Sequence, residues 1–314
     1  MTKNSLTHPF ERPQGVFAAT LTPMDEDYNV DIALLAAHCK WLLAHGTNGI
    51  VLSGTTGEAN SLSVDEKMKV LDGLLAQGIP ASKLIVGTGC CAFPDTVALT
   101  RHAVAQGVAG VLMLPPFYYK GVSDAGLFAS FSEVITRVGA DDLRIYLYHF
   151  PKMSMVPFSL DLISQLLMAY PAQIAGIKDS SGDWGNMSAM VREFPGFDVF
   201  AGSEAFLLDI LQEGGVGCIS ASVNITSPLA GDVYQHWQDA SANGLQAKLT
   251  AVRHAFQAYP FIPTLKGIMH QRSGHASWQA MRPPHLPASQ SEIDAALASM
   301  ATLDFTLEPI NYAV

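Results

Sequence analysis

A lysine at the end of an apolar run is the residue of this chain with the clearest chemical potential. Residues 174–183 read IAGIKDSSGD, so Lys178 follows Ile, Ala, Gly and Ile. Lysine is almost never fully buried unless another group pairs with it or makes use of it. Apolar surroundings disfavour the charged form of an amine, and a free amine can attack a ketone. Lys178 therefore either points out of its strand into water or acts as a nucleophile in a pocket.

Imine chemistry on a lysine has two further requirements. The imine is an electron sink, so a neighbouring carbon can lose a proton or break a carbon–carbon bond, and a proton carrier must stand nearby. A tyrosine whose hydroxyl is hydrogen-bonded can serve. The carboxylate of a 2-oxo acid also needs an anion site. Residues 54–57 read GTTG, which predicts a turn with exposed N–H groups at a helix start, and such groups bind anions.

Eight short β-rich runs recur along the chain, each ending in small or polar residues. They begin near residues 15, 49, 83, 111, 144, 174, 197 and 217. Stretches with helical spacing lie between them, for example residues 30–46 and 63–78. Ser63 followed by Glu66 predicts a capping box at the start of the second stretch. Gly46 stands where a left-handed residue would end the first.

Near-continuous apolar strands that alternate with amphipathic helices indicate a parallel sheet covered by helices. Eight such units favour an α/β fold of the closed (β/α)8 type, a TIM barrel, over an open doubly wound sheet. No Gly-x-Gly-x-x-Gly motif follows the first strand, which weakens the open dinucleotide-binding alternative. We predict a catalytic barrel over residues 1–241 and a C-terminal helical segment over residues 242–314, with helices near 243–258, 261–270 and 290–301.

The active site of a (β/α)8 barrel lies at the carboxyl ends of its strands. In this chain the strand ends supply one lysine, several tyrosines and a cluster of hydroxyl groups. They comprise Thr20, Thr22, residues 53–58, residues 115–119, Tyr148, His149, Lys178, Asp179, residues 202–204 and Ser220. This placement fits a nucleophilic Lys178 but leaves the solvated alternative open.

Four motifs follow one another along the chain: GTTGEANSLS, LPPFYY, LYHFP and GIKDSSGD. Together they resemble the dihydrodipicolinate synthase/N-acetylneuraminate lyase family of pyruvate-dependent class I aldolases. The likeness runs in order through most of the barrel. It implies a (β/α)8 barrel with a C-terminal helical segment, and a covalent Schiff base on Lys178 in place of any cofactor.

The resemblance also implies roles for individual residues. Lys178 would form the Schiff base with pyruvate or another 2-oxo acid, and Tyr148 would shuttle protons. Thr55 and Thr56 would bind the carboxylate through backbone N–H and hydroxyl groups. The other residues expected to bind substrate are Gly54, Gly202, Ser220, Lys152 and Met153.

A tyrosine from a neighbouring subunit is expected to complete the site. Tyr118 matches the aromatic residue that, in the synthases of the family, reaches into the adjacent subunit and completes a Tyr–Thr–Tyr relay. The loop here is one residue longer than usual, which makes Tyr119 the alternative. The resemblance therefore implies a homotetramer built as a dimer of dimers.

One position departs from the family pattern. Synthases that act on aspartate semialdehyde carry an arginine two residues after the strand-five proline, where it binds the carboxylate of the second substrate. The matching residue here is Met153, and a thioether cannot make that bidentate contact. Lys152 is a point charge one residue out of place. We therefore expect a lyase that uses or releases pyruvate and acts with an unidentified aldehyde or sugar acid.

Other functions stay open. One is a 4-hydroxy-tetrahydrodipicolinate synthase proper, against which Met153 stands. Another is a dehydratase that uses the same imine on a 2-keto-3-deoxy sugar acid. A non-catalytic barrel that senses a 2-oxo acid belongs to a different class. A sugar-phosphate isomerase rests only on the glycine loop EGGVGC at residues 213–218, which resembles a phosphate loop.

Composition excludes several partners. With 49% hydrophobic residues, 15% charged residues and a net charge of −10, the 314-residue chain is typical of a compact enzyme and not of a nucleic-acid-binding protein. No run of 18 apolar residues predicts a membrane span, and no signal-peptide pattern is present. The four cysteines are expected to be reduced core residues of a cytoplasmic protein. The ten histidines form no metal-binding motif, so we expect no metal.

Three residues near the strand ends receive structural interpretations. His149 is the neighbour of Tyr148 in a strand and is expected to face a helix. Glu58 and Asp179 are expected to be helix N-terminal charges and hydrogen-bond anchors rather than acid/base residues.

Overall fold

Eight parallel strands form a closed barrel in the computed structural model, which describes residues 12–312. The strands pair in chain order, and β1 closes the barrel by pairing with β8. They are β1 (Gly15–Ala19), β2 (Gly49–Leu52), β3 (Leu84–Gly87), β4 (Gly110–Met113), β5 (Ile145–His149), β6 (Ile174–Asp179), β7 (Asp198–Ala201) and β8 (Gly217–Ser220). Each strand begins at or next to its predicted start, so the (β/α)8 fold is confirmed.

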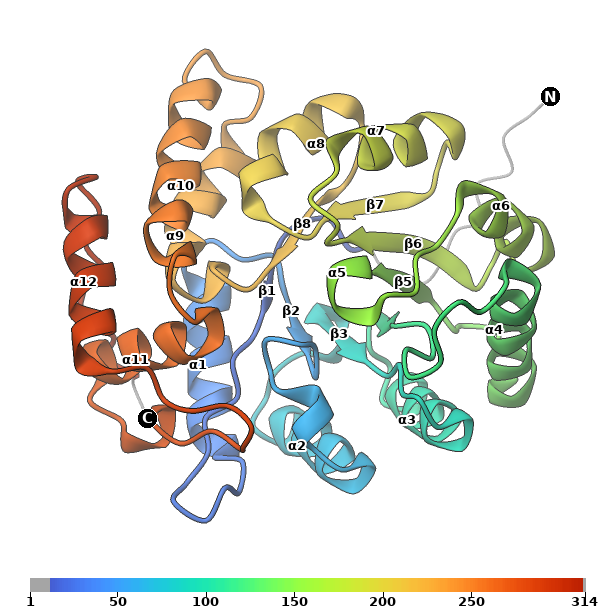
Figure 1. The fold of residues 1–314 in the computed structure, drawn as a ribbon, viewed down its shortest axis with the longest axis horizontal. Helices are drawn as coiled ribbons and strands as arrows, with labels where there is room; N and C mark the ends of the chain where they lie inside the picture. Colours follow the sequence, from blue (N-terminus) through green and yellow to red (C-terminus); the bar gives the residue numbers. More distant parts are fainter. Residues whose placement is uncertain (1–11, 313–314) are drawn as a thin grey trace.

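Most helices cover the barrel from outside, whereas the short helix that follows β5 lies at its mouth (Figure 1). They are α1 (Ile32–Ala44), α2 (Val64–Ala76), α3 (Phe93–Ala105), α4 (Asp124–Val138), α5 (Pro151–Ser154), α6 (Leu160–Ala169), α7 (Trp184–Glu193), α8 (Leu207–Glu213), α9 (Val223–Gln235), α10 (Ala242–Gln257), α11 (Phe261–Ser273) and α12 (Gln290–Ala301). The predicted capping box of α2 is present, because Ser63 and Glu66 each accept the other's backbone N–H. Gly46, with φ +98°, follows the end of α1 as predicted.

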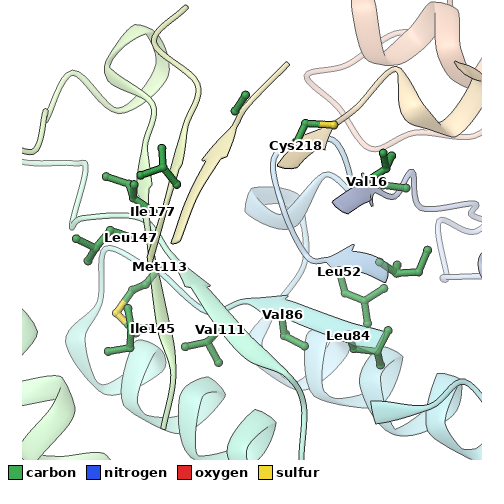
Figure 2. Packing of buried hydrophobic residues seen from close by; sticks show 14 of the residues in the cluster. Val16, Leu52, Leu84, Val86, Val111, Met113, Ile145, Leu147, Ile177 and Cys218 are labelled. Carbon is green, nitrogen blue, oxygen red and sulfur yellow. The ribbon is translucent and has the colours of Figure 1, made fainter. Parts of the chain in front are cut away.

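The strands separate two apolar layers. Alternate strand residues point outward into the space between sheet and helices, where Leu84 and Val86 of β3 project toward the helices (Figure 2). The residues between them point inward and fill the barrel, and this inner cluster includes Ile85, Tyr146 and Phe200. Strand alternation therefore decides which polar side chains at the strand ends can reach the mouth of the barrel.

The C-terminal helices α10, α11 and α12 pack together along one side of the barrel, next to α9 (Figure 1). Their core also takes in Leu21, which follows β1, and Leu34 of α1. The predicted helices are confirmed within three residues at each end. Because these helices share a core with the barrel, the division of the chain between residues 241 and 242 stays a prediction.

A buried histidine links this core to the barrel and gives a pH prediction. His38 Nε2 lies 2.9 Å from Asn224 Oδ1, and its Nδ1 lies 3.0 Å from the hydroxyl of Tyr312. Burial lowers the pKa of His38 from 6.5 to about 4, although Asn224 opposes the shift. The unfolded chain therefore binds a proton that the folded chain does not, so stability is present above pH 6.5 and is lost as the pH falls toward 4.

We expect His38 to account for about 3 kcal/mol of lost stability across this window. Urea unfolding at pH 7.5 and pH 4.5 measures the loss. His38→Gln, whose side chain stays neutral throughout, should have lower stability at pH 7.5 but a smaller fall between the two values. An equal fall in both proteins would show that other groups cause it.

Only two of the four cysteines lie in the core. Cys39 and Cys218 are buried in the core as predicted, but Cys91 is exposed and Cys90 is half-buried, because they follow the end of β3 in a surface turn.

Among residues 12–312, none of the helices combines the length and the apolar character needed to cross a membrane.

Candidate active site

A cavity of about 630 Å³ opens at the carboxyl ends of the strands, and its walls include residues of α10 and α11. This volume lies in the range of small-molecule sites. The predicted site residues that line it are Thr55, Thr56, Tyr148, Lys152, Met153, Lys178 and Gly202. The structure thus brings together residues from distant parts of the chain.

Lys178 points into this cavity. Its neighbour Ile177 belongs to the outer layer, so alternation turns Lys178 inward. Only 5% of Lys178 is exposed, and its Nζ lies 3.4 Å from the hydroxyl of Tyr148 and 4.4 Å from the centroid of that ring. Among residues 12–312 its Nζ takes part in no ion pair. The alternative of a solvated lysine is wrong.

Tyr148 joins the lysine to the turn after β2. Its hydroxyl lies 3.4 Å from Thr55 Oγ1, so Lys178, Tyr148 and Thr55 form a chain of polar groups. In the part of the chain that the structure describes, the backbone N–H groups of Thr55 and Thr56 donate to no backbone acceptor. Unpaired N–H groups of this kind suit an anion.

A buried ion pair fixes the turn that carries these threonines. Ser53 and Glu58, which flank it, both have positive φ, a strained conformation for residues other than glycine. Lys266 of α11 donates to Glu58 Oε1 at 2.8 Å and to the carbonyl oxygen of Thr22 at 2.9 Å. Burial lowers the pKa of Lys266, and the charge of Glu58 opposes the shift. Glu58 is a hydrogen-bond anchor as predicted. The sequence did not predict that its partner would be Lys266 of the C-terminal segment.

Three of the predicted site residues, Gly54, Tyr118 and Ser220, lie outside this cavity. Gly54 lines a smaller adjoining hollow that it shares with Thr55 and Tyr148. Tyr118 is 74% exposed and contacts Tyr119 edge to face, with ring centroids 5.4 Å apart. Neither tyrosine lines the cavity of its own chain.

Ser220 also lies outside the cavity, contrary to its predicted contact with substrate. Its neighbour Ile219 belongs to the inner cluster, so Ser220 points to the outer side of the barrel. There its hydroxyl donates to the carboxylate of Glu204. This geometry does not favour direct contact between Ser220 and a substrate.

Arg253 of α10 is a lining residue that sequence reasoning missed. Its Nη1 donates to Glu204 Oε2 at 2.6 Å and to Ser220 Oγ at 3.0 Å. Burial alone would raise the pKa of Glu204, but the Arg253 charge and the serine hydroxyls leave that pKa below its usual value. One sequence signal existed, because Leu249, Val252 and Phe256 mark the buried face of this helix and Arg253 stands beside it.

The remaining strand-end residues have structural partners. His149 faces outward, and its Nδ1 accepts the backbone N–H of Phe158 at 3.1 Å, which confirms its expected direction. Both carboxylate oxygens of Asp179 accept hydrogen bonds at 2.7 Å, from the Ser181 N–H and the Asn186 amide. Within residues 12–312, no three His, Cys, Asp or Glu side chains are grouped so that they could hold a metal ion.

Comparisons with known proteins agree with one another. Residues 12–302 match the model of the dihydrodipicolinate synthetase family. An uncharacterized DapA-like lyase of Chloroflexus aurantiacus is 35% identical, over 91% of this chain and 96% of its own length. A 4-hydroxy-tetrahydrodipicolinate synthase of Rhizobium meliloti is 31% identical, over 90% and 97%. The crystal structure of dihydrodipicolinate synthase from Agrobacterium tumefaciens aligns with a TM-score of 0.86 at 29% identity, over 93% of this chain and 99% of that one.

Proposed function

Because the chain belongs to the dihydrodipicolinate synthetase family and is a lyase of that family, we propose that it forms a Schiff base between Lys178 and pyruvate, or another 2-oxo acid. The observation that carries this proposal is the buried Lys178 amine, which lies 3.4 Å from the Tyr148 hydroxyl and has no carboxylate partner within residues 12–312. Burying an unpaired charge is costly, so such a lysine is expected where its amine is used.

The reaction proceeds in balanced steps. The Lys178 amine attacks C2 of pyruvate, the keto oxygen takes up protons through Tyr148, and water leaves to give an iminium ion. Loss of a proton from C3 gives an enamine, which attacks the carbonyl carbon of an aldehyde while Tyr148 returns a proton to the aldehyde oxygen. Water then hydrolyses the iminium ion, which frees Lys178 and the new 2-oxo acid. The reverse sequence releases pyruvate.

The turn after β2 would hold the carboxylate of pyruvate. The unpaired N–H groups of Thr55 and Thr56 and their hydroxyl groups are suitable donors, and they sit on a turn that the Glu58–Lys266 pair fixes. Thr55 Oγ1 also contacts the Tyr148 hydroxyl, so it can relay a proton.

We further propose that the enzyme is a cytoplasmic homotetramer in which Tyr118, or its neighbour Tyr119, completes the relay of an adjacent subunit. Both tyrosines are largely exposed, as expected of side chains that leave their own chain. In the same region Met153 and Met155 of the neighbouring segment are exposed, and such apolar groups favour contact with another protein surface. The four cysteines, all free, fit a reducing compartment.

The second substrate is an aldehyde or a sugar acid. Curated relatives are named 4-hydroxy-tetrahydrodipicolinate synthase, which makes that reaction the first alternative. Met153 lines the cavity where those synthases would need an arginine, and Lys152 is exposed at its rim. We therefore favour another aldehyde over aspartate semialdehyde.

Borohydride reduction tests the function. Incubation with pyruvate and borohydride should fix a three-carbon adduct on the peptide that contains Lys178, whereas lactate, which has no keto group, should give none. An unmodified Lys178 peptide would contradict the proposal. Pyruvate release from 2-keto-3-deoxy acids separates aldol cleavage from dehydration, because a dehydratase releases no pyruvate. Adduct formation without turnover of any substrate would indicate a sensor of 2-oxo acids.

A further inference from the structure

We propose that Arg253 determines specificity by binding a carboxylate of the second substrate, so that the partner of pyruvate is an aldehydic acid. This inference rests on the Schiff-base function proposed above. Arg253 reaches the cavity from α10, and it lines the same cavity as Lys178. A molecule attached to the lysine can therefore extend toward a guanidinium group.

The donors of Arg253 are divided between the protein and the cavity. All the hydrogen bonds that it makes within residues 12–312 start from Nη1, and they go to Glu204, Ser220 and Ser222. The Nε and Nη2 donors therefore remain for a ligand. They form one edge of a planar group, and that edge matches the two oxygens of a carboxylate.

The surroundings hold this edge in place before any substrate binds. Glu204 is fully buried and also accepts a hydrogen bond from Thr226 at 3.1 Å. The guanidinium carbon lies 5.5 Å from the centroid of the Phe261 ring. Only 12% of the Arg253 side chain is exposed. A pre-oriented arginine loses little conformational entropy when it binds a ligand.

A second cation at the cavity also suits an acidic substrate. Two cationic side chains, Lys152 and Arg253, line the cavity together with the Lys178 amine. Asp179, whose two oxygens are both occupied by hydrogen bonds, is the carboxylate among the lining residues of the described chain. Neither Lys152 nor Lys178 takes part in an ion pair within residues 12–312. Lys152 therefore adds, at the rim of the cavity, a cation without an ion-pair partner among the described residues, and such a cation attracts an acidic substrate.

Two matched pairs of aldehydes test this inference in condensation with pyruvate. Glyoxylate is compared with acetaldehyde, and succinic semialdehyde with butanal, because in each pair a carboxylate replaces a methyl group. We expect kcat/KM to favour the acid of at least one pair by about 10- to 100-fold, the range for a charge-assisted hydrogen-bonded pair. In the double variant Arg253→Gln/Glu204→Gln, which leaves no unpaired buried charge, this preference should fall to near unity.

Controls separate this inference from the function on which it rests. The borohydride-trapped pyruvate adduct should still form in the double variant, and Arg192→Gln, which removes an exposed arginine from its pair with Glu213, should keep the wild-type preference. If the double variant does not fold, the single variant Arg253→Lys tests the inference in its place. It keeps the charge but not the planar fork, so the preference should fall about tenfold.

Three results would overturn the inference while the adduct on Lys178 still forms. They are equal kcat/KM for acid and neutral aldehydes in the wild type, an unchanged preference in the double variant, and a stronger preference for glyceraldehyde 3-phosphate than for every carboxylic acid. Absence of the adduct in the wild type would instead refute the proposed function.

Discussion

Replacing Lys178 by methionine is expected to abolish the borohydride-trapped pyruvate adduct and to lower kcat by about 10⁴-fold or more, because the variant lacks the amine that forms the imine. Stability should be unchanged or higher. Lys178 is 5% exposed and lacks an ion-pair partner among the described residues, so an apolar side chain of similar length removes a buried polar group and leaves no carboxylate unpaired.

The combination of these two effects makes the test specific. Adduct formation by mass spectrometry, kcat with the best substrate found, and urea unfolding are measured on the same preparation. Lys69→Met, a change at an exposed lysine of α2, serves as the matched control and should retain the adduct and the activity. A methionine variant that loses several kcal/mol of stability would mean that Lys178 is a structural residue.

The local sequence pattern was sufficient to predict the barrel and the residues at the centre of the site, Lys178 and Tyr148. Near-continuous apolar strands between amphipathic helices allow few arrangements, and eight repeats select the closed one. Alternation within a strand then distinguished Tyr148, which faces the cavity, from His149, which faces a helix. The same rule applied to β8 would have turned Ser220 outward, because Ile219 is the residue of that strand that fills the barrel.

The outer part of the site depends on tertiary packing that no local pattern encodes. Lys266 pairs with Glu58, which is 208 positions away in the sequence, and Arg253 pairs with Glu204, which is 49 positions away. Each pair forms only because the C-terminal helices fold back onto the barrel beside the strand ends. A helix pattern shows which face is buried, but it does not show which charged neighbour that face will meet. Substrate specificity was therefore less predictable than the chemistry of the imine.

Replacing Tyr148 by phenylalanine is the second change with a large expected effect. The ring should stay in place, since it packs beside Phe150 with centroids 5.7 Å apart and lies under the Lys178 amine. The hydroxyl that joins Lys178 to Thr55 is lost. We expect kcat to fall by about 10²- to 10⁴-fold, the usual contribution of a positioned proton carrier. Tyr170→Phe, a change at a half-buried tyrosine outside the cavity, is the matched control.

Exchange of the C3 hydrogens of pyruvate for deuterium shows which step this hydroxyl serves. In the wild type, pyruvate alone should exchange through the enamine, and the signal of its methyl group in the proton NMR spectrum should decay. In Tyr148→Phe the adduct on Lys178 should still accumulate slowly under borohydride, while exchange slows in proportion to kcat. If exchange keeps its wild-type rate and only turnover falls, Tyr148 moves the proton of the aldehyde oxygen and another group removes the C3 proton. If neither rate changes, the polar chain from Lys178 to Thr55 is not a proton path, and the buried contact between amine and hydroxyl serves only to position the lysine.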